Sequence, residues 1–286
     1  MRRLSTALTA IVLLVSCGQQ TNNTQQPDSL ATPKGSAQAA KRSAGNVTSI
    51  ISRYEAAVMI SAFLNQPNLG EYAIDKTLGG IFERSVFELD DTKAGALLWF
   101  CFNQKEPGDR QWFLAASKAG GYTPAVTREA SDDLWKPYDF FKYTGASKDT
   151  TDVLTFIESH QYGAPGKSPV LPQAEARMQV EDFMTTLLPS FDPKPGQLMK
   201  YPFCFFGEMS ADFQIKKLLD QPGAIGVRYY FGYENKNEYG YEINNKIRVI
   251  LVAIDKYGKN ILLGNKDGDG DIMIEKAFPP PPSSND

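Results

Sequence analysis

Residues 265–276, near the carboxyl terminus, have the oxygen-rich spacing that comes closest to a metal site. Side chains with oxygen atoms alternate around Gly270 in the sixth position, as in loops that wrap a calcium ion. Two positions depart from that pattern: the first is Asn265, and the last, where a bidentate carboxylate is expected, is Lys276. The stretch predicts either a calcium site or a Gly/Asp turn between two short strands, and the departures favour the turn. The calcium ligands would be Asn265, Asp267, Asp269, Asp271 and Glu275.

A second group of candidate residues lies at 223–260, which has the pattern of a long β-hairpin. Arg228 is flanked by apolar residues, and a charge among large side chains needs a partner. Arg228 and Tyr230, with Glu208 or Asp255 nearby, form a candidate anion-binding pocket. The alternative, which the pattern favours, is a structural ion pair within the sheet.

Tyrosines cluster around the polar segment that joins the two strands of this hairpin. Exposed tyrosines separated by Asn and Glu can stack on sugars or contact a protein partner. The alternative is packing within the sheet beside a loop tip. The candidate binding residues of the hairpin are therefore Arg228, Tyr230, Tyr233, Tyr239 and Tyr241.

Carboxylates that could perform general acid–base catalysis on a glycosidic bond occur as adjacent pairs. Such pairs are usually solvated residues at the end of a helix, so the hydrolase interpretation is an alternative only. The residues concerned are Asp90 and Asp91, Asp132 and Asp133, and either Glu83 or Glu88.

Histidine and cysteine are scarce, which limits the chemistry further. The single histidine, His160, excludes zinc sites built within one chain from two or three imidazoles. No acid–nucleophile frame surrounds His160 and Ser159, which argues against a Ser-His-Asp triad. Cys101 and Cys204 could pair in an exported protein, or Cys101 could be a small core residue, and the sequence leaves both possibilities open.

The amino terminus has the pattern of an export signal. Arg2 and Arg3 precede a mostly apolar segment, 4–15, that is too short to span a bilayer comfortably. The segment ends in Leu14-Val15-Ser16-Cys17, which resembles the lipobox of bacterial lipoproteins. This resemblance implies cleavage before Cys17 and lipid attachment to it, and several acyl chains anchor a protein firmly. Gly18 and the two glutamines after it favour an outer-membrane anchor with the body facing the periplasm.

The composition predicts a tether after the anchor and argues against a nucleic-acid partner. Residues 18–45 contain almost no large apolar side chain, so we expect a disordered segment. Removing the leader changes the net charge from −3 to −5, because Arg2 and Arg3 are lost. Nucleic-acid binding requires clustered Lys and Arg, so it is not expected.

The rest of the chain has two segments with the same order of expected elements. Each has a helix, a shorter helix and a β-hairpin, and the hairpin crossing in the second is about ten residues longer. We therefore expect an α+β fold in which an antiparallel sheet is covered by helices, built from two diverged helix–helix–hairpin halves. The expected helices are 49–64, 81–89, 151–158, 174–188 and 212–219, and the expected hairpins are 95–117 and 223–254.

These features divide the chain into five parts. They are the signal peptide 1–16, the tether 17–45, the first half 46–165, the second half 166–278 and the Pro-rich tail 279–286.

The second hairpin carries a spaced set of residues: Pro222, Gly223, Gly226, Arg228, Tyr230, Gly232, Val252, Asp255, Gly258 and Asn260. In these residues it resembles a group of exported lipoproteins from the Bacteroides-like phylum. The resemblance covers about forty residues and implies no particular activity. We expect a lipid-anchored protein of the cell envelope that binds a protein or glycan partner or acts as a scaffold, without a cofactor. The alternatives are an acid–base hydrolase of envelope polymer or glycan and a calcium-dependent interaction module.

Overall fold

In the computed structural model of the protein, the predicted leader, tether and tail lie outside the residues that can be described. The described residues all belong to one unit of the chain, Lys41–Asp286. They are 48–88, 96–106, 108–120, 134–162, 166–192, 194, 196–209, 214–235, 245–264 and 273–276.

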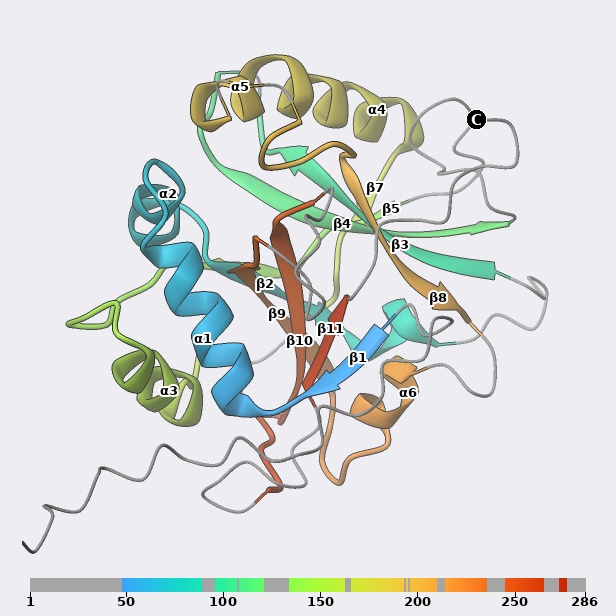
Figure 1. The fold of residues 1–286 in the computed structure, drawn as a ribbon. Coiled ribbons are helices and arrows are strands. Elements are labelled where there is room, and N and C mark those ends of the chain that lie inside the picture. The colour runs from blue at the N-terminus through green and yellow to red at the C-terminus, as the bar shows by residue number, and fades with distance from the viewer. Residues whose placement is uncertain are drawn as a thin grey trace, which may run out of the picture. The chain divides into compact units, whose positions relative to one another are not determined.

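Two antiparallel sheets form the centre of this unit (Figure 1). The first sheet has the order β1-β11-β10-β9-β2-β6 and the second has the order β7-β5-β4-β3-β8. The strands of the first sheet are β1 (Thr48–Ile51), β11 (Met273–Lys276), β10 (Ile247–Ile254), β9 (Gly226–Tyr233), β2 (Gly79–Glu83) and β6 (Asp139–Phe141). Those of the second are β7 (Val170–Leu171), β5 (Leu134–Trp135), β4 (Trp112–Gly120), β3 (Ala96–Gln104) and β8 (Phe203–Glu208).

Helices flank the two sheets. Helix α1 begins with a capping box, in which the Ser52 hydroxyl accepts a hydrogen bond from the Glu55 N–H while the Glu55 carboxylate accepts one from the Ser52 N–H. Helix α1 packs on β9, α3 packs on α1, and α4 packs on β3. The helical elements are α1 (Arg53–Leu64), α2 (Leu69–Asp75), η1 (Arg84–Phe87), α3 (Thr150–Ser159), α4 (Gln173–Asp182), η2 (Phe183–Leu187), α5 (Leu188–Phe191) and α6 (Gln214–Leu219).

Aromatic side chains fill the space between the two sheets. Trp112 of β4 stacks on Phe231 of β9 with ring centroids 4.8 Å apart, and Phe100 of β3 lies 5.4 Å from Phe82 of β2. The buried Tyr229 hydroxyl of β9 accepts a hydrogen bond from a backbone N–H of β4. Since aromatic side chains bury the largest areas, this interface supplies much of the hydrophobic stabilisation.

Alternation along β9 sends its side chains to two different layers. Tyr229 and Phe231 face the second sheet, whereas Arg228, Tyr230 and Gly232 face the helices. A Cβ added to Gly232 would come within 2.9 Å of the Met59 side chain of α1, so glycine allows α1 to approach the strand closely.

The two cysteines lie on adjacent strands but face opposite sides of the second sheet. Cys204 of β8 is paired with Phe100 of β3 and faces the main core, whereas Cys101 faces the cluster under α4. Both are buried and free, so this geometry answers the question of their pairing that the sequence left open.

The structure confirms the α+β class, but it has two antiparallel sheets where the sequence predicted one. The predicted helix 81–89 is wrong, because its first residues form β2 and the next form the 3₁₀ helix η1. Pairing of β2 with both β9 and β6 outweighs the local preference of a short apolar run, which is ambiguous between helix and strand. Strand β8 was also missed, since none of the expected helices or hairpins covers its residues.

Each sheet combines strands from both predicted halves of the chain. The hairpin β3–β4 from the first half pairs with β8 from the second, and the hairpin β9–β10 from the second pairs with β2 from the first. The order β1-β11-β10-β9-β2 therefore corresponds strand by strand to the order β7-β5-β4-β3-β8, and every pairing is antiparallel.

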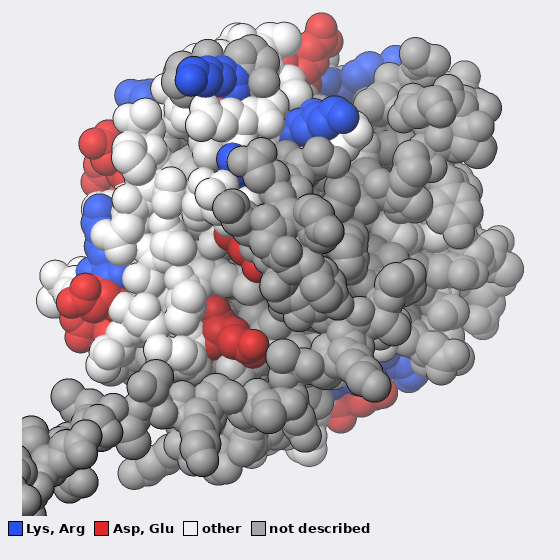
Figure 2. Space-filling view, viewed as in Figure 1, with Lys and Arg blue, Asp and Glu red and all other residues white. Residues whose placement is uncertain are grey.

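Charged side chains of both signs are interspersed on the face that carries α1 (Figure 2). Among the helices of the described residues, none is long and apolar enough to cross a membrane.

Candidate functional site

Arg228 is the centre of a buried polar cluster on the helix-facing side of β9. Its side chain is 0% exposed, and its Nη1 donates a hydrogen bond to Asn260 Oδ1 over 2.6 Å. Its Nη2 donates to the carbonyl oxygens of Gly258, at 2.7 Å, and Tyr162, at 3.3 Å. The guanidinium also lies over the Phe141 ring, 5.3 Å from its centroid. Carbonyl dipoles and an aromatic face therefore surround this buried cation.

Within the described part of the chain, Arg228 makes no ion pair with a carboxylate. Asp139 of β6 lies on the same cross-strand row, with Ile81 of β2 between them. Burial raises the pKa of Asp139, while the Arg228 charge partly lowers it. Burial likewise lowers the pKa of Arg228. The Asp255 carboxylate instead accepts hydrogen bonds from backbone N–H groups of its own turn.

Tyr230 and His160 complete the cluster. Asn260 Nδ2 donates to the Tyr230 hydroxyl at 2.7 Å, and the same hydroxyl is hydrogen-bonded to His160 Nδ1, also at 2.7 Å. Burial, and secondarily the Arg228 charge, lowers the pKa of His160 to about 3. The neighbouring Ser159 hydroxyl bonds to the Thr155 carbonyl oxygen instead of to the imidazole.

The structure thus brings Arg228 and Tyr230 together but seals both from solvent behind α3 and the 255–260 turn. Asn260 and His160 are the partners that sequence reasoning did not assign to them. Tyr233, at the end of β9, is half-buried, and burial raises its pKa. Tyr239 and Tyr241, at the hairpin crossing, lie outside the described residues, and the Glu208 side chain is also not described.

Cys17 and most of the predicted calcium ligands fall outside the described residues. These ligands are Asn265, Asp267, Asp269 and Asp271, and the fifth, Glu275, belongs to β11, whose backbone pairs with both β1 and β10. Within the described ranges there is no cluster of three or more His, Cys, Asp or Glu side chains that could hold a metal ion.

The predicted catalytic acids are only partly described. The Glu83 carboxylate accepts the backbone N–H of Ser168, and Glu88 forms an exposed ion pair with Arg84 at 3.6 Å. The pairs Asp90-Asp91 and Asp132-Asp133 lie outside the described residues.

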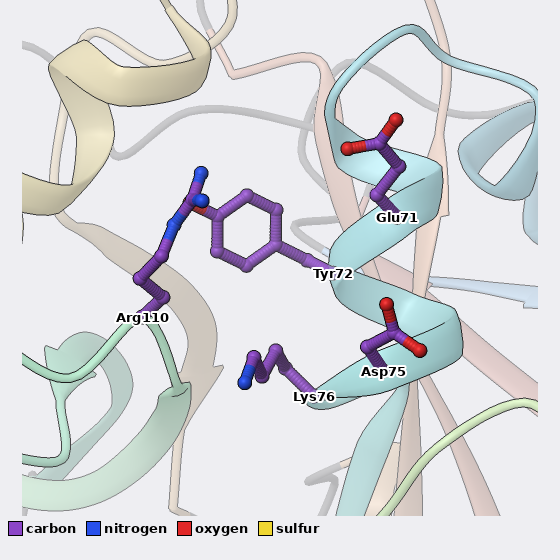
Figure 3. A pocket seen from close by; sticks show the side chains of 5 residues that line it. All are labelled: Glu71, Tyr72, Asp75, Lys76 and Arg110. Carbon is purple, nitrogen blue, oxygen red and sulfur yellow. The ribbon is translucent and has the colours of Figure 1, made fainter.

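A pocket that the sequence did not indicate lies between α2 and the turn of the β3–β4 hairpin (Figure 3). It is a shallow hollow with a cavity volume of about 80 Å³, and it is open to solvent. Five residues line it: Glu71, Tyr72, Asp75, Lys76 and Arg110.

Tyr72 forms the fixed part of this pocket, which we call the Tyr72 pocket. The Tyr72 side chain is buried, and its hydroxyl lies 3.0 Å from Ser190 Oγ, which donates to the Leu187 carbonyl oxygen. Since that donation uses the serine proton, the Tyr72 hydroxyl donates to Ser190 Oγ. Arg110 Nε donates to the same tyrosine oxygen at 2.9 Å, and the guanidinium lies 5.1 Å from the ring centroid. Arg110 is therefore oriented although it is exposed.

The charged residues of the Tyr72 pocket are not paired with an opposite charge among the described residues. Glu71, Asp75, Lys76 and Arg110 are exposed, and none forms an ion pair with another described residue. Figure 3 shows the Arg110 guanidinium on one side of the Tyr72 ring and the Glu71 and Asp75 carboxylates on the other, with the Lys76 nitrogen below the ring. Two groups of each sign thus line one hollow that is open to solvent.

Sequence reasoning missed this pocket because no local motif marks it. The sequence does contain a weak signal for helix α2. Leu69, Tyr72 and Ala73 have the apolar spacing of one face of a helix. Arg110 is 38 residues from Tyr72, so their approach depends on the tertiary fold.

Comparison of the chain with protein-family models, with curated proteins and with solved structures gives no match.

Proposed function

We propose that this protein is a lipid-anchored binding protein of the bacterial cell envelope and that it captures a small charged ligand in the Tyr72 pocket. The observation that carries the binding role is the oriented but exposed Arg110 guanidinium beside three further charges that make no ion pair within the described part of the chain. Because Nε is held by Tyr72, the two terminal nitrogens of Arg110 are left for a ligand, and less conformational entropy is lost on binding.

The anchor rests on the amino-terminal pattern. An apolar segment that ends in Leu14-Val15-Ser16-Cys17 supports lipidation of Cys17 and export from the cytoplasm. The polar residues that follow support a tether that holds the folded unit away from the lipid headgroups, and Gly18 supports an outer-membrane location facing the periplasm.

Metabolic labelling with a palmitate analogue tests the anchor. We expect label on the wild-type protein and none on Cys17→Ala, which should also leave the membrane fraction. Cys101→Ala is the matched control, since Cys101 is buried and should not change labelling. Label that survives Cys17→Ala contradicts the anchor.

Calorimetric titration of the mature chain in detergent tests the binding site. The probes are glycine, sodium acetate, methylammonium chloride and inorganic phosphate. We expect at least one of them to bind and that binding to be lost in Arg110→Gln. Lys217→Gln, which removes an exposed positive charge from α6, is the control. If no probe binds, the small-ligand role is contradicted.

We further propose that residues 46–165 and 166–278 are diverged copies of one ancestral unit. The matching strand orders of the two sheets support this proposal, because β1, α1, β2, η1, β3, β4 and β5 correspond in order to β7, α4, β8, α6, β9, β10 and β11. Helix α1 packs on the hairpin of the second half and α4 on that of the first, which supports an exchange of amino-terminal arms between the copies.

A further inference from the structure

We infer that the ligand of the Tyr72 pocket is a small zwitterion, a molecule that carries both a carboxylate and an ammonium group, such as a free amino acid or a short peptide. This inference rests on the proposed binding role and specifies its ligand class.

The charge balance of the pocket favours a ligand that carries both signs of charge. Two carboxylates and two cationic groups line one hollow, and none is neutralised by another described residue. A simple anion would meet Glu71 and Asp75, and a simple cation would meet Lys76 and Arg110. Each would face like charges, which oppose binding. A zwitterion presents an opposite charge to both sides.

The arrangement of these groups favours a carboxylate at one end of the ligand and an ammonium group at the other. Glu71 and Asp75 are four positions apart on α2, so their side chains lie on one face of the helix, one turn apart. Arg110 comes from the hairpin turn across the pocket and is oriented by Tyr72. An arginine fork with free terminal nitrogens matches the two oxygens of a carboxylate, while two acids can accept hydrogen bonds from an ammonium group.

The Tyr72 side chain defines what lies between the two charged sides. Its ring lies between the Arg110 guanidinium and the two carboxylates in Figure 3, and its hydroxyl is already bonded to Ser190 and Arg110. The Tyr72 residue is 4% exposed, so only a small part of its ring could contact the methylene groups that join the two charges of an amino acid.

A titration series that varies the separation of the two charges tests the inference. The probes are glycine, β-alanine, 4-aminobutyrate and glycylglycine, with acetate and methylammonium as single-charge controls. We expect one or more zwitterions to bind at least about tenfold more tightly than either control, since each bonded charge contributes at about that level. Acetate or methylammonium binding as tightly as the best zwitterion would overturn the inference.

Charge-removing variants should switch the preference. Glu71→Gln combined with Asp75→Asn is expected to weaken zwitterion binding and to strengthen acetate binding, whereas Lys76→Gln combined with Arg110→Gln should favour methylammonium. Glu181→Gln on the exposed face of α4 is the control and should change neither. An unchanged preference in both double variants contradicts the assignment.

The outcomes separate this inference from the proposed function. Binding of phosphate or acetate alone, lost in Arg110→Gln, would retain the binding role and overturn the zwitterion. Failure of every probe would overturn both.

Discussion

Arg228 donates a hydrogen bond to Asn260 Oδ1 over 2.6 Å, while the amide nitrogen of the same Asn260 donates to Tyr230 and to the Ile157 carbonyl oxygen. Asn260 therefore connects β9, the end of α3 and the turn after β10 through one buried side chain. A buried cation without a carboxylate partner depends on such neutral acceptors, since removal of one leaves the charge less satisfied.

Asn260→Ala should destabilise the protein strongly. It removes an acceptor from a buried guanidinium and two donor contacts, and hydrogen bonds to charged groups contribute about 1.5–3 kcal/mol each. We expect a loss of at least about 3 kcal/mol in the free energy of unfolding, measured by urea denaturation. The control is Asn235→Ala, at an exposed position, which should change stability little. A loss in Asn260→Ala no larger than in this control would contradict the role assigned to Asn260.

His160 should make the protein less stable as the pH falls below about 6. Its folded-state pKa of about 3 lies below the ordinary value of 6.5, so between these values the unfolded chain binds a proton that the folded chain does not. This group alone should lower the free energy of unfolding by about 1.4 kcal/mol per pH unit across that window. Its contribution is constant above pH 6.5.

Two measurements check this pH dependence. Because the chain has one histidine, its imidazole resonances can be assigned without ambiguity, and they should titrate below pH 4 in the folded protein. His160→Gln, which can still accept a hydrogen bond from Tyr230, should reduce the pH dependence of unfolding by one proton. Titration of the imidazole near pH 6.5 would mean that it is not held neutral by burial.

The difference between what the sequence predicted and what it missed follows from the range of the interactions. The hairpin β9–β10 was predicted well, because its two apolar runs are long and its pairing is local. Strands β2 and β8 were missed because each is short and becomes a strand by pairing with a hairpin from the other half of the chain. Neither segment carries a local signal strong enough to decide between helix and strand.

The polar residues show the same limit. The apolar residues around Arg228 predicted a buried charge that needs a partner, and Tyr230 was predicted to lie nearby. Asn260 and His160 could not be identified as the partners, because only the tertiary fold brings them to Arg228 and Tyr230. The Tyr72 pocket was missed for the same reason, since Tyr72 and Arg110 meet only when α2 approaches the hairpin turn.

The thiols of Cys101 and Cys204 should stay reduced and unreactive in the folded protein. They face opposite sides of the second sheet, and burial raises the pKa of Cys101 far above its ordinary value, which suppresses the reactive thiolate. In a Cys17→Ala variant prepared without reductant, we expect no reaction with a thiol reagent until guanidinium chloride is added, and then two thiols per chain. Recovery of no thiols after unfolding would reveal a disulfide.

The two halves of the chain should not fold separately. Residues 46–165 would contain β3–β4 without β8, and residues 166–278 would contain β9–β10 without β2, so each fragment would leave a hairpin edge and an aromatic face exposed. We expect each fragment alone to lack the near-ultraviolet circular dichroism that ordered aromatic residues produce. Mixing them should restore it, because each fragment supplies the strands that the other lacks. As a control, Trp112→Ala in the first fragment should weaken this complementation, since its ring stacks on Phe231 of the second. A native-like spectrum from either fragment by itself would show that the exchanged strands are dispensable for folding.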